Sequence, residues 1–169
     1  MTRRLPLILL LLAAGPESPL QVGAMLPRLE GDYLSKRKAV LPADCQGKYA
    51  LLAFGFSYDS RFQVEPWGKE FDRVFKGNPK VTLYEIPMIG GLGRLGAPFI
   101  DAGMRRGTPK EKHENVITVY GGTGPWKKWL GVTDKKAAYL VLLDPEGRIL
   151  FLHSGPVSEA ALEPNPGPM

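Results

Sequence analysis

The sequence has a single cysteine, Cys45, among its 169 residues. One cysteine excludes an internal disulfide, a C-x-x-C dithiol and a cysteine-rich metal site. Proline and glycine lie on either side of it, at Pro42 and Gly47, which predicts a loop or short turn. A lone cysteine is more often a small buried apolar residue than a nucleophile. We therefore expect Cys45 to be inert, and a one-cysteine peroxidase nucleophile is the alternative.

The sequence also lacks a dominant cluster of charge of one sign. The formal net charge is +5, and like charges occur only in short runs such as Lys36-Arg37-Lys38. Because nucleic-acid binding needs a clustered basic face, we expect no nucleic-acid partner. The densest basic stretch comprises Arg105, Arg106, Lys110, Lys112 and His113. It could bind an acidic partner loop or lipid headgroups, although helix capping and a solvated loop are slightly favoured.

No apolar run is long enough to cross a bilayer, which needs about 20 residues. Residues 1–24 instead have the pattern of an export signal: Arg3 and Arg4, an apolar run, and then small residues up to Ala24. We expect an exported, periplasmic or otherwise extracytoplasmic protein, with an uncleaved anchor as the alternative. The rest of the sequence predicts one domain over residues 25–163, which ends in a short helix from about Ser158. Residues 164–169 are expected to form a frayed tail.

The periodicity of apolar residues predicts alternating strands and helices in that domain. Residues 26–42 are expected to form a polar, extended lead-in, and residues 49–56 a central strand. A capping box of Ser60 and Gln63 is expected to begin the first helix, which contains Pro66 and ends at Gly77. The further expectations are strands over 81–89, 115–120 and 139–143, helices up to Gly107 and over 124–130, and a hairpin partner over 148–153.

This order of elements, closed by Leu142-Leu143-Asp144-Pro145-Glu146-Gly147-Arg148-Ile149 after Gly131-Val132, resembles the thioredoxin-like superfamily. The likeness is greatest to its peroxiredoxin and periplasmic thiol-oxidoreductase branch. The resemblance covers roughly residues 25–163. It implies an α/β fold with a central mixed β-sheet flanked by helices, a C-terminal β-hairpin and a final helix.

Three shorter motifs resemble a narrower group, related to the mitochondrial ATP synthase assembly factor. They are Phe62-Gln63-Val64-Glu65-Pro66-Trp67, Gly103-Met104-Arg105-Arg106-Gly107-Thr108-Pro109 and Ala138-Tyr139-Leu140-Val141-Leu142-Leu143-Asp144. That factor is a chaperone for the membrane sector of ATP synthase. The resemblance implies a protein partner, namely a membrane-embedded complex.

Two departures from the superfamily pattern concern the redox site. The loop that should carry the thiols reads Tyr58-Asp59-Ser60-Arg61 and contains no cysteine. The family's cis-proline would fall near Ala138, and a residue other than proline does not adopt a cis bond cheaply. Because a thiolate at the helix start is required, we expect no thiol–disulfide exchange at this degenerate loop.

Two further groups of residues have features of binding sites. Asp59, Arg61 and Glu65 could form an acid–base or anion-binding set at a helix N-terminus, but a cap and a solvated ion pair are more common. Gly91-x-Gly93-x-x-Gly96 matches a dinucleotide fingerprint without the acidic residue that should follow the next strand. We therefore expect no nucleotide and no other cofactor.

The aromatic and histidine residues give weaker signals. Trp67, Trp126 and Trp129 are expected to pack in the core or at its edge, while an exposed pair would suit a protein-binding surface. His113 and His153 have no ligand-spaced partner, so we expect no metal site.

The sequence thus predicts an exported thioredoxin-like protein that is non-enzymatic and binds another protein, and the resemblance implies a role in the assembly of a membrane complex. Trp67, Arg105, Arg106, His113 and Trp126 are the candidate partner-binding residues. The alternative is a degenerate peroxiredoxin-like oxidoreductase that uses Cys45. A third hypothesis is a small-ligand carrier with a cleft between residues 58–61 and 90–96.

Overall fold

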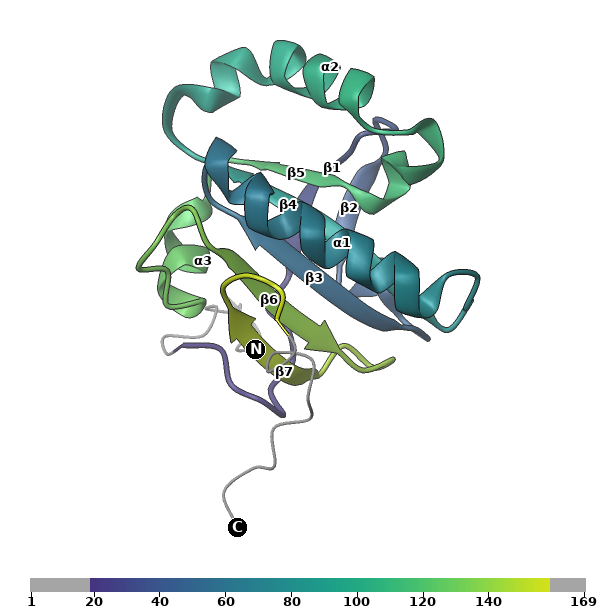
Figure 1. Cartoon of the computed structure of the whole chain (residues 1–169). Helices are drawn as coiled ribbons and strands as arrows, with labels where there is room; N and C mark the ends of the chain where they lie inside the picture. The colour runs from purple at the N-terminus through teal and green to yellow at the C-terminus, as the bar shows by residue number, and fades with distance from the viewer. Residues whose placement is uncertain (1–18, 159–169) are drawn as a thin grey trace, which may run out of the picture.

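The computed structural model of the chain describes residues 19–158 (Figure 1). A seven-stranded mixed sheet forms its centre, in the order β2-β1-β5-β4-β3-β6-β7. The strands are β1 (Leu29–Tyr33), β2 (Lys38–Leu41), β3 (Tyr49–Gly55), β4 (Val81–Ile89), β5 (Ile117–Tyr120), β6 (Ala138–Leu143) and β7 (Ile149–Ser154). The helices are α1 (Arg61–Phe75), α2 (Ala97–Gly107) and α3 (Thr123–Trp129).

The centre of the sheet agrees with the predicted order. Strands β3, β4 and β5 are parallel, and β6 pairs antiparallel with β3. The turn at residues 144–147 returns the chain as β7, antiparallel to β6. Strand β4 is apolar on both sides because it lies in the middle of the sheet. The predicted C-terminal helix and tail, and most of the leader, lie outside the described residues.

Residues 26–42, which the sequence predicts only as an extended segment, form two strands of the sheet. Residues 26–42 form the hairpin of β1 and β2, and β1 also pairs antiparallel with β5. Leu29 and Tyr33 are buried from β1, as are Ala39 and Leu41 from β2. Buried positions two residues apart are typical of a strand. The polar residues between these buried positions predicted only an extended segment.

Helix α1 begins differently from the predicted capping box. Ser60 already has helical backbone angles, because residues 58–60 form a 3₁₀ turn before α1. Its hydroxyl donates to the carbonyl of Ser57 at 2.6 Å instead of capping the helix. The side chain of Gln63 accepts a hydrogen bond from the backbone N–H of Ala138 at 3.1 Å. Pro66 lies within one continuous helix.

The helices cover the sheet unequally. Helix α1 packs Val64 and Trp67 on the side of Ala53 and Leu140, while α3 places Trp126 on the opposite side, stacked on Phe54 at 5.4 Å. Helix α2 lies apart from the sheet in Figure 1, and none of its residues is buried. Residues of α2 and α1 line a groove at this end of the sheet.

Residues 19–24, at the end of the predicted leader, pack on the domain. Leu20 is buried in the main core, and its N–H donates to the carbonyl of Trp129. Gly23 and Ala24 exchange backbone hydrogen bonds with Ile149 at the start of β7. The folded unit therefore reaches back to Leu20, and a cut after Ala24 would remove these contacts.

Candidate functional site

The turn at residues 58–61 lies at the carboxyl end of β3. The family resemblance places the redox cysteines in this turn, and the sequence has none there. Ala138 lies beside it, since Gly55 at the end of β3 is opposite Ala138 in the ladder with β6. Gly55 is required here, because a Cβ on it would lie 2.3 Å from the Ser60 Oγ. The turn at residues 58–61 and Ala138 are therefore adjacent, and neither provides a thiol or a cis-proline.

The polar residues of this turn do not form one acid–base set. Asp59 is within 3.6 Å of Lys136, and Arg61 lies over the rings of Tyr58 and Phe62, at 4.0 and 4.7 Å from their centroids. Glu65 lies one helical turn further on and contributes to a groove beside the turn. Such arginine–aromatic contacts hold the exposed rings in place.

Cys45 is remote from this turn, in a 3₁₀ turn over Ala43–Cys45 before β3. The residue is 1% exposed, and its thiol donates to the carbonyl of Pro42 at 3.2 Å. Burial raises the pKa of the Cys45 thiol to about 11, and the nearby Asp44 also raises it. Because a thiol attacks as the thiolate, this geometry argues against a nucleophile.

A groove of about 770 Å³ opens between α1 and α2, over the carboxyl ends of β3 and β4. Its apolar lining comes from several elements: Phe56, Val64, Ile86, Met88, Ile89, Ile100 and Met104. Tyr58 and Arg61 border it on one side, and Phe99 of α2 on the other. The groove therefore occupies the place where a redox site was expected, with an apolar surface instead of thiols.

Large apolar side chains are exposed at the groove border and in the neighbouring parts of α1 and of the segment before α2. Tyr58 and Phe62 are 75% and 65% exposed. Leu92 and Leu95 are each 81% exposed and Phe99 is 83% exposed, more than any other large apolar residue among those described. We call Leu92, Leu95 and Phe99 the apolar ridge. Contiguous exposed apolar surface of this kind typically marks an interaction site.

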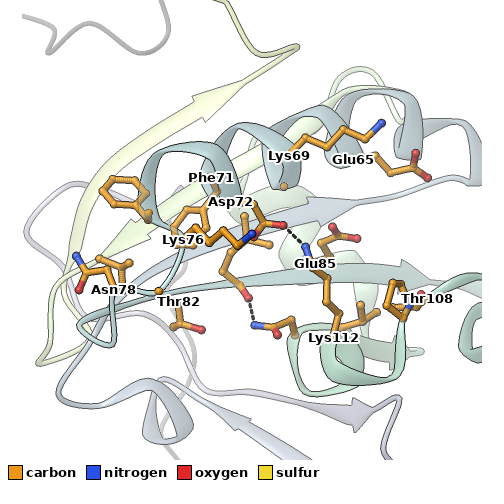
Figure 2. A pocket seen from close by; sticks show the side chains of 18 of the residues that line it. Glu65, Lys69, Phe71, Asp72, Lys76, Asn78, Thr82, Glu85, Thr108 and Lys112 are labelled. Atoms are coloured by element: carbon orange, nitrogen blue, oxygen red, sulfur yellow. Dashed lines mark hydrogen bonds and ion pairs between the residues drawn. The ribbon is translucent and has the colours of Figure 1, made fainter.

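Glu85 of β4 is a carboxylate between the groove and a second cavity, of about 450 Å³, beneath the C-terminal half of α1 (Figure 2). Gly68 leaves room for it, since a Cβ there would be 2.9 Å from the Glu85 Oε1. Burial raises the pKa of Glu85; the negative charge of Glu65 also raises it, whereas Lys112 lowers it. In the same cavity Lys112 pairs with Asp72.

Two of the candidate partner-binding residues are core residues. The indole of Trp67 is buried and donates to the carbonyl of Gly155 at 3.0 Å. Trp126 is buried between Phe54 and Trp129. The expectation that Trp67 and Trp126 contact a partner is therefore corrected, because the core occupies both rings.

The remaining candidates lie at the end of α2 and after it. Arg105 is half-buried beside Tyr120, Arg106 is exposed, and the His113 ring lies 3.0 Å from the carbonyl of Thr108. The ring of His153 packs against the ring of Trp67, with 5.5 Å between their centroids. His153 is far from His113 in the sequence, and the two residues have different contacts. No three metal-ligating side chains come together within residues 19–158.

The glycine-rich segment forms a 3₁₀ helix, η3 (Gly91–Gly96), that leads directly into α2. Gly91 has a positive φ of 60°, and a Cβ on Gly93 would lie 2.4 Å from Ile89. These two glycines thus allow a tight turn close to β4. The cleft of the third hypothesis exists between Tyr58, Arg61 and Gly90, but it is apolar and continues along α2.

Sequence reasoning missed the apolar ridge and Glu85. The helical spacing of Leu95 and Phe99 predicts a helix but not the direction of their side chains, which point into solvent. Glu85 lies within the predicted strand over residues 81–89. A single acidic residue within Val81–Ile89 was the available signal, since a carboxylate in a central strand requires a partner or a cavity.

No protein-family model matches the chain, and no curated protein does. Many solved structures are similar in fold. The pneumococcal exposed lipoprotein thioredoxin from Streptococcus pneumoniae has a TM-score of 0.56 and 18% identity, covering 80% of this chain and 95% of its own. The thioredoxin domain of a thiol-disulfide oxidoreductase from Bacteroides vulgatus has a TM-score of 0.54 and 22% identity, covering 79% and 88%.

A peroxiredoxin-like protein from Aquifex aeolicus is similar at a TM-score of 0.51 and 16% identity, covering 84% of this chain and 79% of its own. At these identities the likeness concerns the fold. The chain accordingly has a thioredoxin-like fold with one buried cysteine. No helix within residues 19–158 combines the length and apolar character that a membrane span requires.

Proposed function

We propose that this thioredoxin-like chain is an exported, non-enzymatic protein that binds a segment of another protein in the groove between α1 and α2. The observation that carries the proposal is the groove itself: an apolar site of about 770 Å³ at the degenerate redox loop, bordered by exposed aromatic rings. Aromatic residues beside a desolvated pocket are typical energetic centres of protein interfaces.

The narrower proposal is a factor that assists the assembly of a membrane complex. It rests on the three short motifs that resemble the ATP synthase assembly factor group. Two of them contribute to the groove: Val64 and Glu65 from the first, and Gly103, Met104 and Gly107 from the second. Similarity in fold to an exposed lipoprotein thioredoxin is consistent with export.

A degenerate peroxiredoxin activity is disfavoured because the thiol of Cys45 is buried and its pKa is raised. The Cys45→Ala variant separates the two functions. Loss of a measurable peroxide reductase activity in this variant would contradict the non-enzymatic proposal.

The direct test is purification of the tagged full chain from mildly cross-linked, detergent-solubilised membranes, followed by mass spectrometry. We expect a defined complex that is lost from Tyr58→Glu, which places a charge at the groove border. Tyr49→Glu is the matched control, since Tyr49 is an exposed tyrosine that does not line the groove. Arg105→Ala with Arg106→Ala tests the basic end of α2. Equal recovery with Tyr58→Glu and the wild type would refute the groove as the binding site.

A further inference from the structure

The segment from η3 through α2 has an unusual relation to the rest of the fold. Neither element contains a buried residue, although together they comprise residues 91–107. The apolar ridge, Leu92, Leu95 and Phe99, is the most exposed group of large apolar side chains among residues 19–158. Because these side chains gain so little burial on folding, they can still be buried against another molecule or surface.

Two arginines accompany the residues of the ridge. Arg94 lies between Leu92 and Leu95 in the sequence, and Arg106 lies two helical turns after Phe99, on the same face of α2. Both are exposed, and neither forms an ion pair with a residue that the structure describes. The acidic residue of α2, Asp101, accepts a hydrogen bond from the Tyr120 hydroxyl at 2.6 Å on the side of β5.

We propose that the apolar ridge and the two arginines dock on the surface of an anionic phospholipid bilayer. Apolar side chains that enter the acyl boundary, beside cations that meet acidic headgroups, are the elements of peripheral membrane attachment. Free arginines favour this occupant over a neutral apolar protein surface, because buried unpaired guanidinium groups would be costly there. This inference does not depend on the protein partner of the groove.

The test reports locally on the ridge, because an apolar leader in the full chain could itself bind lipid. In the Cys45→Ala background, Leu95→Cys and Val74→Cys each receive an environment-sensitive fluorophore. The probes are protein-free vesicles of phosphatidylcholine, with and without phosphatidylglycerol. We expect a blue shift at position 95 with the anionic vesicles only, and no shift at position 74.

Replacing both arginines by glutamine, Arg94→Gln with Arg106→Gln, should weaken the vesicle binding reported by the fluorophore at position 95 about 25-fold, since each cation contributes about fivefold. The matched control replaces two exposed lysines outside the ridge, Lys48→Gln with Lys80→Gln. This change should alter vesicle binding by less than about twofold, because salt screens charges that lie far from the membrane surface. An equal loss in both pairs would contradict recognition of headgroups by the ridge.

Four other outcomes would overturn the proposal. The first two are no shift at position 95 with anionic vesicles and an equal shift at both positions. The third is a shift that grows with protein concentration without vesicles, which would assign the ridge to a second copy of the chain. The fourth is a shift seen only with detergent-solubilised membranes, which would assign the ridge to a protein. Because the vesicles contain no protein, failure here leaves the result of the groove experiment unaffected.

Discussion

The reactivity of Cys45 offers a quantitative test of the site. A thiol with a pKa of about 11 carries about a hundredfold less thiolate near pH 8 than one with the reference value of 9.0, because each unit is a factor of ten. The residue is also 1% exposed, so that reaction requires local opening. Alkylation of the native chain should therefore be at least about a hundredfold slower than alkylation in guanidinium.

The assay follows incorporation of a small thiol reagent by mass spectrometry in native and denatured protein. An exposed reference thiol, Val74→Cys in the Cys45→Ala background, should react at similar rates in both conditions. The native rate at Cys45 should continue to rise between about pH 9 and pH 11, where the denatured rate levels off. A native rate within about tenfold of the denatured rate would refute the burial argument and restore the peroxidase alternative.

Three further predictions concern stability. Glu85→Gln should raise the melting temperature near neutral pH and have little effect near about pH 4, because a raised carboxyl pKa costs stability as the pH increases through its titration; an effect independent of pH would contradict this. Gly31→Ala should cost about 1–3 kcal/mol in urea unfolding, because a Cβ would lie 2.7 Å from the β5 backbone, whereas Gly124→Ala, with open space around it, should be nearly neutral. Trp67→Phe should cost about 1–2 kcal/mol through its lost indole hydrogen bond, and an unchanged unfolding midpoint would show that the bond contributes nothing.

The fold was predictable where apolar periodicity and turn chemistry agree. The bounds of β4 follow from a segment that is apolar at most positions, and the hairpin of β6 and β7 from its Asp-Pro-Glu-Gly turn. The hairpin of β1 and β2 was missed because its inward positions include Gly31 and Ala39, which contribute little apolar signal. Short strands with small inward residues depend on pairing partners that the sequence does not identify.

The candidate site was predictable only in part. The absence of thiols at residues 58–61 and the expected place of Ala138 follow from counting along the fold, and in the structure Gly55, at the end of β3, lies opposite Ala138. The outward direction of Phe99 could not be predicted, because helical spacing does not indicate which neighbour a helix has. Helix α2 has an amphipathic sequence whose apolar side faces an open groove instead of a filled core.

The carboxylate of Asp44 has a consequence for how the sheet meets other molecules. It accepts hydrogen bonds from the backbone N–H of Val40 at 3.0 Å and the hydroxyl of Tyr33 at 2.9 Å. Val40 belongs to β2, the outermost strand on that side, and Lys38 adds a charge beside it. An outer strand whose amide is already occupied, and which carries a lysine, is a poor template for an incoming strand. Growth of the sheet by addition of a foreign strand is thus opposed at the β2 edge.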